Sequence, residues 1–226
     1  MAHNIGTLNE KPLHASLKEW YAQPGDQFEV EVNGYFIDIV RGDLLIEIQT
    51  RNFSSIKRKV NELVKAYPLR LVYPIAQEKW IVKQPPEGGL QRRRKSPKRG
   101  QPLEVFKELV SFPELLGHEN FSLEVAMIQE EEVRHYDRKK GWRKRGWITD
   151  ERRLISMVDQ YQFQTPRDIW SLIPTDLPNE FTTTNLAAVM GTNKRFAQQV
   201  AYCLRKMGII QQIGKQGRSN LYQYQD

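Results

Sequence analysis

Alternation of apolar and polar residues over positions 28–49, interrupted by two tight-turn signals, constrains the fold more than any other feature of the chain. Asn-Gly at 33–34 is a strong signal for a two-residue hairpin, and Gly-Asp at 42–43 is a good second one. Three antiparallel strands are therefore predicted, and pairing outward from the turns sets Ile39 opposite Ile46. The residues predicted to share one apolar face are Phe28, Val30, Val32, Tyr35, Ile37, Ile39, Leu44, Ile46 and Ile48.

The same period of two gathers acidic side chains on the other face, with Glu29 opposite Asp38 and Asp38 opposite Glu47. Gln49 follows on the side of Glu47. Like charges opposed across a ladder destabilise a sheet, so a compensating cation or a raised pKa is needed. Hard cations such as Mg²⁺ take carboxylate and carbonyl oxygens, which Asp38, Glu47 and the backbone carbonyl of Ile48 would supply. The alternative is a sheet face that is simply open to water.

The elements around these strands alternate in type. One helix is predicted over about 9–22 and a second over 54–67, where Pro68 ends it. Apolar runs at 69–75 and 79–83 predict further strands, the first of them suited to a buried parallel position. The order is αβββαβ with one further strand, which places the chain in the α/β or α+β class.

With this order and register, residues 8–84 resemble the core of the PD-(D/E)XK nuclease superfamily, a restriction-endonuclease-like αβββαβ fold. The matching residues are Asp38 on the second predicted strand and the triplet EIQ at 47–49 on the third, in the place of the (D/E)xK motif. Glu10 in the first predicted helix matches the glutamate that many members carry there. The resemblance implies hydrolysis of phosphodiester bonds, with Mg²⁺ or Mn²⁺ held by Asp38 and Glu47.

One residue departs from the family pattern. The usual lysine is Gln49 here, which can orient a water molecule by hydrogen bonds but supplies neither a charge nor a base. Some active members resemble this pattern, and in others a basic residue moves to the next helix, so Lys57 or Arg51 would take its place. Equally, the change would mark a core that binds without cutting. The catalytic candidates are Asp38, Glu47, Gln49, Glu10 and Lys57.

Positive charge is concentrated in one short run, because six basic residues and no acidic residue lie in positions 91–100 of a chain with net charge +7. The surrounding stretch 85–102 combines prolines, glycines and like charges, so it cannot bury enough surface to fold alone. We expect it to be a flexible basic linker after a nuclease-like domain at 1–84. It favours contact with a polyanion, the alternative being a solvated charge run. The predicted nucleic-acid contacts in it are Arg92, Arg93, Arg94 and Lys95.

The last third of the chain carries an independent signal. Thr-Pro at 165–166 predicts a helix start, and 182–226 read as helix, turn, helix and a two-stranded hairpin. This looks like a winged helix-turn-helix within a predicted domain 151–226. Its second helix would bury Cys203 in an apolar stripe, and the alternative role of such a domain is protein contact. The outward side chains suited to base edges and phosphates are Asn193, Lys194, Arg195, Gln198, Gln199, Lys215 and Arg218.

Residues 103–150 are the hardest part to interpret, and they are treated as an insertion of unknown role. A short helix is predicted at 103–110, and 121–149 alternate like a long hairpin. Its cations lie among tryptophans, which is typical of backbone tracking with base stacking, but the hairpin could equally neutralise its own charges. Residues 151–163 predict a helix that leads into the C-terminal domain. The candidate contacts in this region are Lys144 and Arg145.

Composition narrows the function classes. The lone Cys203 excludes an intramolecular disulfide framework, and four scattered histidines lack zinc-ligand spacing. Without an apolar leader or span, the chain is expected to be cytoplasmic with no membrane partner. Two hypotheses follow: a Mg²⁺- or Mn²⁺-dependent nuclease acting on nucleic acid, DNA before RNA, and a non-enzymatic DNA-binding or adaptor protein with an inactive nuclease-like core. The resemblance is compatible with a homodimer.

Overall fold

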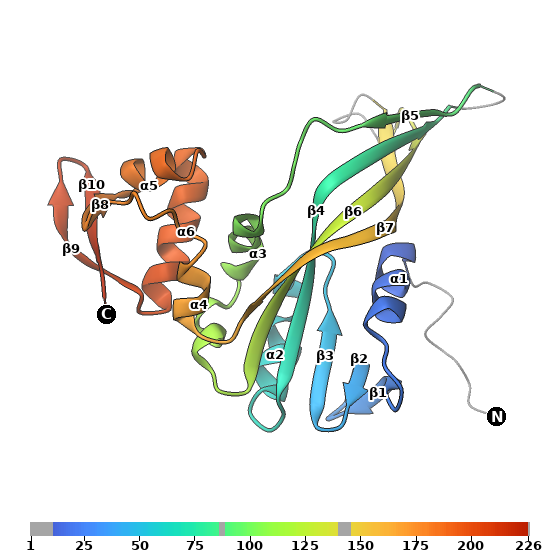
Figure 1. Cartoon of the computed structure of the whole chain (residues 1–226), viewed down its shortest axis with the longest axis horizontal. Coiled ribbons are helices and arrows are strands. Elements are labelled where there is room, and N and C mark those ends of the chain that lie inside the picture. Colours follow the sequence, from blue (N-terminus) through green and yellow to red (C-terminus); the bar gives the residue numbers. More distant parts are fainter. Residues whose placement is uncertain (1–10, 86–88, 140–145, 226) are drawn as a thin grey trace.

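The computed structural model describes residues 11–85, 89–139 and 146–225 (Figure 1). Its centre is one large mixed sheet of long, curved strands, and a small antiparallel sheet lies in the C-terminal part. Helices lie against both faces of the large sheet. The mixed class of helices and strands predicted from the sequence is therefore confirmed.

The N-terminal elements follow the predicted αβββαβ order. They are α1 (Pro12–Tyr21), β1 (Gln27–Val32), β2 (Tyr35–Arg41), β3 (Leu44–Ile48), a 3-10 turn (Phe53–Ile56), α2 (Lys57–Leu63) and β4 (Leu69–Gln84). Ile39 pairs with Ile46 as predicted, and β3 runs parallel to β4. The two strands predicted at 69–75 and 79–83 are one strand, in which pairing continues across the polar residues between them with one register irregularity after Ala76.

The middle of the chain supplies strands of the large sheet instead of an insertion. Its elements are β5 (Arg92–Lys95), 3-10 turns (Pro102–Val105 and Pro113–Gly117), α3 (Phe106–Leu109), β6 (Phe121–Tyr136) and β7 (Trp147–Phe163). The large sheet has the strand order β1-β2-β3-β4-β6-β7, with β5 paired to β4. The hairpin prediction is confirmed for β6 and β7, which pair antiparallel along their length.

Two expectations for this region are wrong. Residues 151–163 belong to β7 and not to a helix, because pairing with β6 overrides the helical spacing of their apolar residues. Two of the three irregularities in that pairing leave Ile155 and Val158 unpaired, and these side chains are 44% and 45% exposed. The expected flexible linker contains β5, since pairing with β4 supplies the partner that its composition lacks. The predicted domain boundary at residue 151 falls within β7.

The C-terminal elements include the predicted helix, turn, helix and hairpin. They are α4 (Pro166–Trp170), β8 (Glu180–Thr182), α5 (Thr183–Val189), α6 (Lys194–Lys206), β9 (Ile210–Gln216) and β10 (Ser219–Tyr224). Thr165 caps α4 through a capping box with Asp168, as the start signal predicted. Cys203 is buried in the apolar stripe of α6, as expected. Within the described residues, no helix has the length and apolarity needed to cross a membrane.

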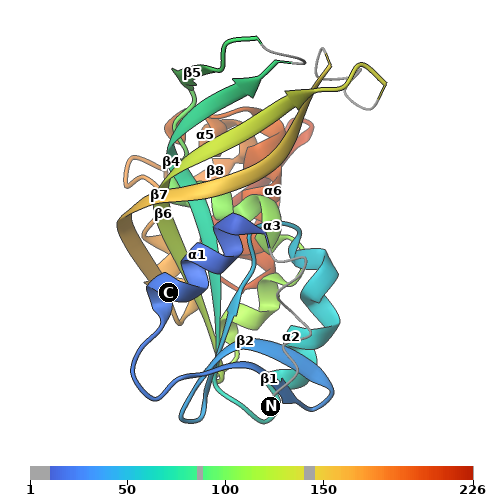
Figure 2. The same cartoon turned by 90° about the vertical axis from the view of Figure 1, so that its right-hand side faces the viewer.

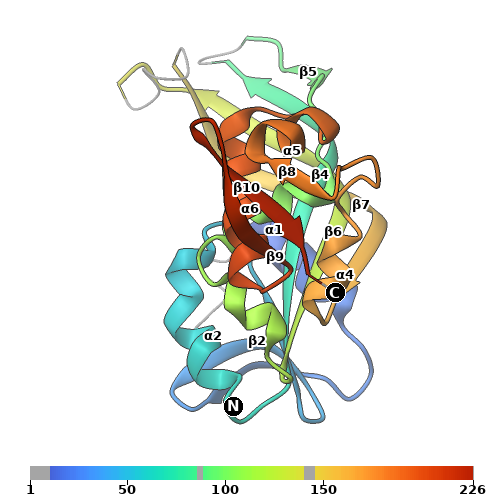
Figure 3. The same cartoon turned by 90° about the vertical axis from the view of Figure 1, so that its left-hand side faces the viewer.

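Two apolar cores cover the two faces of the large sheet. On one face α1 packs Leu13 and Leu17 against Ile46 and its neighbours (Figure 2). On the other face α2, α3 and the C-terminal elements share one continuous core, which reaches from Ile37 to Tyr222 (Figure 3). The single apolar face predicted for the first three strands is therefore only partly correct: the helices divide its residues, and Phe28 is 45% exposed.

The edge of β4 changes partner along its length. β3 pairs with it as far as Val72, and β5 pairs with it from Trp80. Between them the segment before α3 lies against β4, where the Gly100 amide donates to the Ala76 carbonyl at 2.9 Å. A Cβ atom on Gly100 would lie 2.5 Å from that carbonyl oxygen. The approach therefore requires glycine.

We expect Gly100→Ala to lower the free energy of unfolding by about 1–3 kcal/mol, because the added methyl group would collide with backbone and not with a movable side chain. Urea unfolding followed by circular dichroism measures this change. Gly214→Ala on β9 is the matched control, since a Cβ atom there meets no atom within 4 Å. Equal stability of the two variants would contradict the close approach.

Candidate active site

Asp38 of β2 and Glu47 of β3 lie where the pairing of these two strands ends, one residue beyond the Ile39–Ile46 pair. Both are buried, at 9% and 6% exposure, so the alternative of a face open to water is wrong. The amide of Ile48 donates to Asp38 Oδ2 at 2.7 Å. The strand register thus brings together the two acids predicted from the sequence.

Two basic side chains, neither predicted from the sequence, contact this pair. Lys59 of α2 donates its Nζ to Glu47 Oε2 at 2.6 Å and to the Phe36 carbonyl at 2.5 Å. His14 of α1 places its Nε2 3.2 Å from Asp38 Oδ2. The site therefore links β2 and β3 to α1 on one face of the sheet and to α2 on the other.

The basic residue that α2 supplies is Lys59 and not the predicted Lys57. Two residues correspond to about 200° around a helix, so Lys57 lies on a different side and is exposed. The spacing contained a usable signal: Lys59 directly precedes the buried Val60 and is one turn before the buried Leu63. That position borders the face of the helix that packs on the sheet.

Glu47 has an unusual proton affinity. Burial raises its pKa, and the neighbouring Asp38 charge raises it further; Lys59 and His14 oppose both effects without cancelling them. The pKa of Glu47 is about 7. A carboxyl group that exchanges its proton near neutral pH, beside a second carboxylate, is typical of a functional site.

Gln49 is committed to the turn after β3. Its amide nitrogen donates to the carbonyls of Arg51 and Asn52 at 2.6 and 3.1 Å and to Ser55 Oγ at 3.2 Å. Asn52 adopts a left-handed backbone with φ of 60°, so these bonds hold a strained turn. In this arrangement Gln49 stabilises the turn that leads to α2.

Two predicted acids do not join the pair. Glu29 has a left-handed backbone, φ 52°, and its side chain accepts a hydrogen bond from Lys18 at 2.5 Å. The predicted row of three carboxylates is therefore wrong at Glu29, because the local backbone turns its side chain toward α1. Glu10 lies outside the described residues.

The residues present fit a hard divalent cation. Asp38, Glu47 and the carbonyl of Ile48 would supply the oxygen ligands, and Mg²⁺ commonly uses one or two carboxylates with water and substrate phosphate. Within the described ranges no group of three or more His, Cys, Asp or Glu is placed to hold a metal ion. Water and phosphate oxygens would therefore complete the coordination.

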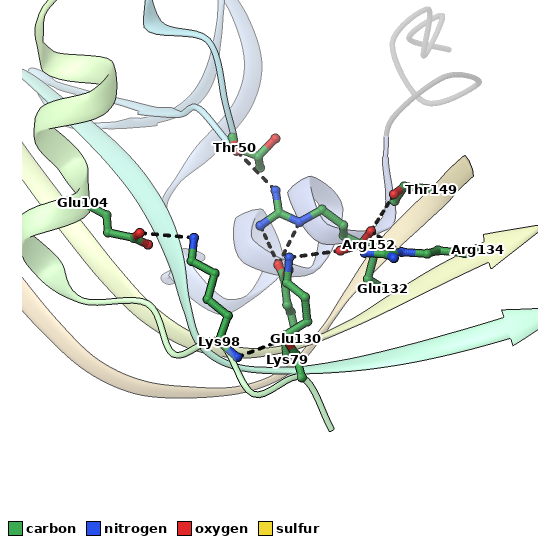
Figure 4. Close-up of polar contacts among 10 residues, drawn as sticks. Thr50, Lys79, Lys98, Glu104, Glu130, Glu132, Arg134, Thr149 and Arg152 are labelled. Atoms are coloured by element: carbon green, nitrogen blue, oxygen red, sulfur yellow. Dashed lines mark hydrogen bonds and ion pairs between the residues drawn. The ribbon is translucent and has the colours of Figure 1, made fainter. Parts of the chain in front are cut away.

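A second cluster of charged side chains lies beyond the end of β3 (Figure 4). Glu130 and Glu132 of β6 are buried, and Lys79 of β4 forms ion pairs with them at 2.7 and 3.0 Å. Arg152 of β7 donates Nε and Nη2 to Glu130 Oε2 at 2.8 and 2.5 Å. Its Nη1 donates to the Thr50 carbonyl at 3.3 Å, which links the cluster to the chain leaving β3.

This cluster forms part of the wall of a hollow of about 620 Å³ on the sheet. Lys98, Glu104 and Lys107 line it on the far side, and the same three residues line a smaller hollow of about 300 Å³. The smaller hollow extends to Asn193, the N-cap of α6. A polar surface thus runs from the end of β3 to the start of α6.

The predicted nucleic-acid contacts fall into three groups. Arg92, Arg93, Arg94 and Lys95 are exposed on β5, where Arg93 pairs with Glu131 at 2.7 Å and Lys95 with Glu78 at 2.8 Å. Lys144 and Arg145 lie outside the described residues. The remaining residues are on α6 and the β9–β10 hairpin: Asn193, Lys194, Arg195, Gln198, Gln199, Lys215 and Arg218.

The structure brings part of the third group together. A hollow of about 350 Å³ lies between α6 and the β9–β10 hairpin. Lys194 and Gln198 line it from the helix, with Arg205 two turns further along, and Arg218 lines it from the hairpin. Asn193 caps the helix by accepting a hydrogen bond from the Phe196 amide at 2.9 Å.

Comparison with known proteins places the large sheet in a family. The family described as "Domain of unknown function (DUF8091)" matches residues 11–164, from α1 to the end of β7. The chain belongs to this family. An uncharacterized protein of Treponema pallidum (strain Nichols) is 29% identical over 220 residues, covering 96% of this chain and 86% of its own length. No solved structure matches the chain. The DUF8091 region contains both charged clusters, whereas α6 and its hairpin lie outside it.

We expect Mn²⁺ affinity, measured by titration calorimetry, to fall roughly tenfold between pH 8 and pH 6. The physical reason is that protons compete with the cation for Glu47 below its pKa of about 7. Glu47→Gln should abolish this uptake, and Asp38→Asn should weaken it strongly. An affinity that stays constant over this pH range, or that survives in Glu47→Gln, would rule out Glu47 as a ligand.

Proposed function

We propose that this protein is a metal-dependent nuclease that hydrolyses phosphodiester bonds in DNA. The observation that carries the proposal is the buried pair of Asp38 and Glu47, at the end of two paired strands and contacted by Lys59. The order α1, β1, β2, β3, α2, β4, with β3 parallel to β4, supports assignment to the PD-(D/E)XK superfamily. In that superfamily the corresponding acids hold the catalytic cation.

Each residue of the pair has a defined task in this proposal. Asp38, Glu47 and the carbonyl of Ile48 would hold Mg²⁺ or Mn²⁺, which would polarise the phosphodiester and lower the pKa of an attacking water. Lys59 supplies the positive charge that the usual motif lysine supplies, from α2 instead of β3. Gln49 then needs no catalytic role, because its amide holds the turn after β3.

A winged-helix assignment of the C-terminal elements supports nucleic acid as the substrate. In this reading α6 is the recognition helix and the β9–β10 hairpin is the wing. Lys194, Gln198 and Arg218 line one hollow, where cationic and amide donors suit phosphates and base edges. The polar surface from α6 to the end of β3 would guide a strand toward the acidic pair.

A second candidate function is a DNA-binding or adaptor protein with an inactive nuclease-like core. The observation that favours it is Gln49, which stands where the motif usually has lysine and is bound to the turn. This candidate predicts nucleic-acid binding with a steep salt dependence and no effect of metal.

Cleavage of labelled single-stranded DNA, duplex DNA and structured RNA in Mg²⁺, Mn²⁺ or EDTA separates the two functions. We expect metal-dependent cleavage of DNA that is abolished in Asp38→Ala and in Glu47→Ala, with binding nearly intact because neither acid lines the hollow between α6 and the hairpin. Cleavage that persists in both variants would exclude this pair as the active site. Binding without cleavage under any metal condition would favour the inactive core.

Replacing each of the two α2 lysines by alanine tests the role of Lys59. We expect Lys59→Ala to lower the cleavage rate by roughly 100-fold, because a positioned charge beside the reacting phosphate is removed. Lys57→Ala is the control, since Lys57 is on the same helix and is exposed. Metal affinity measured on both variants separates loss of chemistry from loss of the cation. Equal rates in the two variants would remove Lys59 from the mechanism.

A further inference from the structure

The hollow of about 620 Å³ beyond β3 carries an excess of positive charge. Two acids, Glu104 and Glu132, line it, and Glu130 is fully buried beneath its cations. The cations that line it are Arg51, Lys79, Lys98, Lys107, Arg134 and Arg152. Six positive charges against three negative ones leave a net charge of about +3 around a space of small-ligand size.

The buried acids hold part of this cationic wall in place. Arg134 donates to Glu132 at 2.8 Å, and Thr149 donates to the same carboxylate at 2.5 Å. Burial alone would raise the pKa of Glu132, but these bonds and that from Lys79 outweigh it and lower the pKa to about 2. Fixed side chains lose little entropy when an anion binds to them.

The outer cations are less fully compensated. Lys98 and Lys107 both pair with the single carboxylate of Glu104. Arg51 is exposed on the turn that Gln49 holds, and no acidic partner contacts it among the described residues. Arg51 therefore lines the hollow with its charge available, four residues after Glu47 in the chain.

Most of the remaining lining of the hollow is apolar, with Thr50, Ser96 and Thr149 as its polar members. Tyr73, Pro74 and Ile81 of β4 and Ile148 of β7 contribute to it. Phe53 contacts the Tyr73 ring edge-on at 5.1 Å between centroids and so orients it. A site with a cationic rim and an aromatic and aliphatic floor matches a ligand that has both a base and a phosphate.

We propose that this hollow binds the phosphorylated terminal nucleotide of a nucleic-acid strand. A terminal phosphomonoester carries close to two negative charges, whereas an internal phosphodiester carries one, so the excess charge favours a strand end. Arg51 and Lys98 contact the phosphate, and the base lies on Tyr73. The further step, in which the rest of the strand leads to Asp38 and Glu47, rests on the nuclease function proposed above. Binding of the strand end to the hollow does not rest on it.

The test is fluorescence anisotropy of the full chain in EDTA with labelled 12-nucleotide DNA strands. The strands carry a 5′ phosphate, a 3′ phosphate or hydroxyl groups at both ends. We expect a phosphate at one of the two ends to tighten binding by tenfold or more relative to the strand with hydroxyl ends. The reason is that a hydrogen bond to a charged group contributes about this much free energy. Equal affinity for all three strands would overturn the proposal.

A double variant, Arg51→Ala with Lys98→Ala, should abolish the preference for the phosphorylated end. The matched control is Arg58→Ala with Lys65→Ala, which removes the same charge from exposed positions at α2 and should leave the preference unchanged. A preference that survives in the first variant would locate the end elsewhere and refute the assignment to this hollow.

Free nucleoside monophosphate is the competitor that separates a strand end from a free nucleotide. We expect it to displace the phosphorylated strand at least tenfold less well than an unlabelled copy of that strand. Equal competition would make the hollow a nucleotide site and overturn the strand-end proposal. The Glu47→Ala variant separates the two proposals. It should lose cleavage and keep the preference for the phosphorylated end, which shows that binding of the end does not depend on the nuclease function.

Discussion

The parallel pairing of β4 with β6 is the constraint on which the other features depend. It extends from Leu69 opposite Phe121 to Gln84 opposite His135, whereas β3 accompanies β4 only as far as Val72. Two apolar cores cover the faces of the sheet and extend slightly past that point, to Met127 and Ile128. Beyond Val72, β4, β6 and β7 continue without β3, and both charged clusters lie near the end of β3. Carboxyl ends of parallel strands are common ligand sites, because the sheet stops supplying partners there.

The two clusters shift the pKa of a buried acid in opposite directions. Glu47 has too little compensating charge, so burial and Asp38 raise its pKa to about 7. Glu132 receives bonds from Arg134, Thr149 and Lys79, which lower its pKa to about 2. In the first cluster, a bound cation would stabilise the charged form of Glu47. In the second, the buried acids hold the cationic side chains in fixed positions, where an anion would meet them. In the nuclease proposed above, the first cluster would hold the catalytic cation and the second would bind an anion.

The polar surface connects these clusters to the C-terminal elements. Lys98 and Lys107 line both hollows between β4 and α6, and the N-cap Asn193 lines the second. The shared apolar core holds α6 and the sheet in one body, so this path does not depend on a flexible linker. In the proposed nuclease, this packing would fix α6, the polar surface and the Asp38–Glu47 pair relative to one another.

The sequence by itself determined the local features. These are the capping of α4 by Thr165 and the turns that set Ile39 opposite Ile46, which place Asp38 and Glu47 one residue beyond that pair. These depend on residues close together in the chain. Only the tertiary structure decided that 151–163 form a strand and that Lys59 contacts the acids. Both outcomes depend on partners distant in sequence, whose pairing and packing energies outweigh local periodicity.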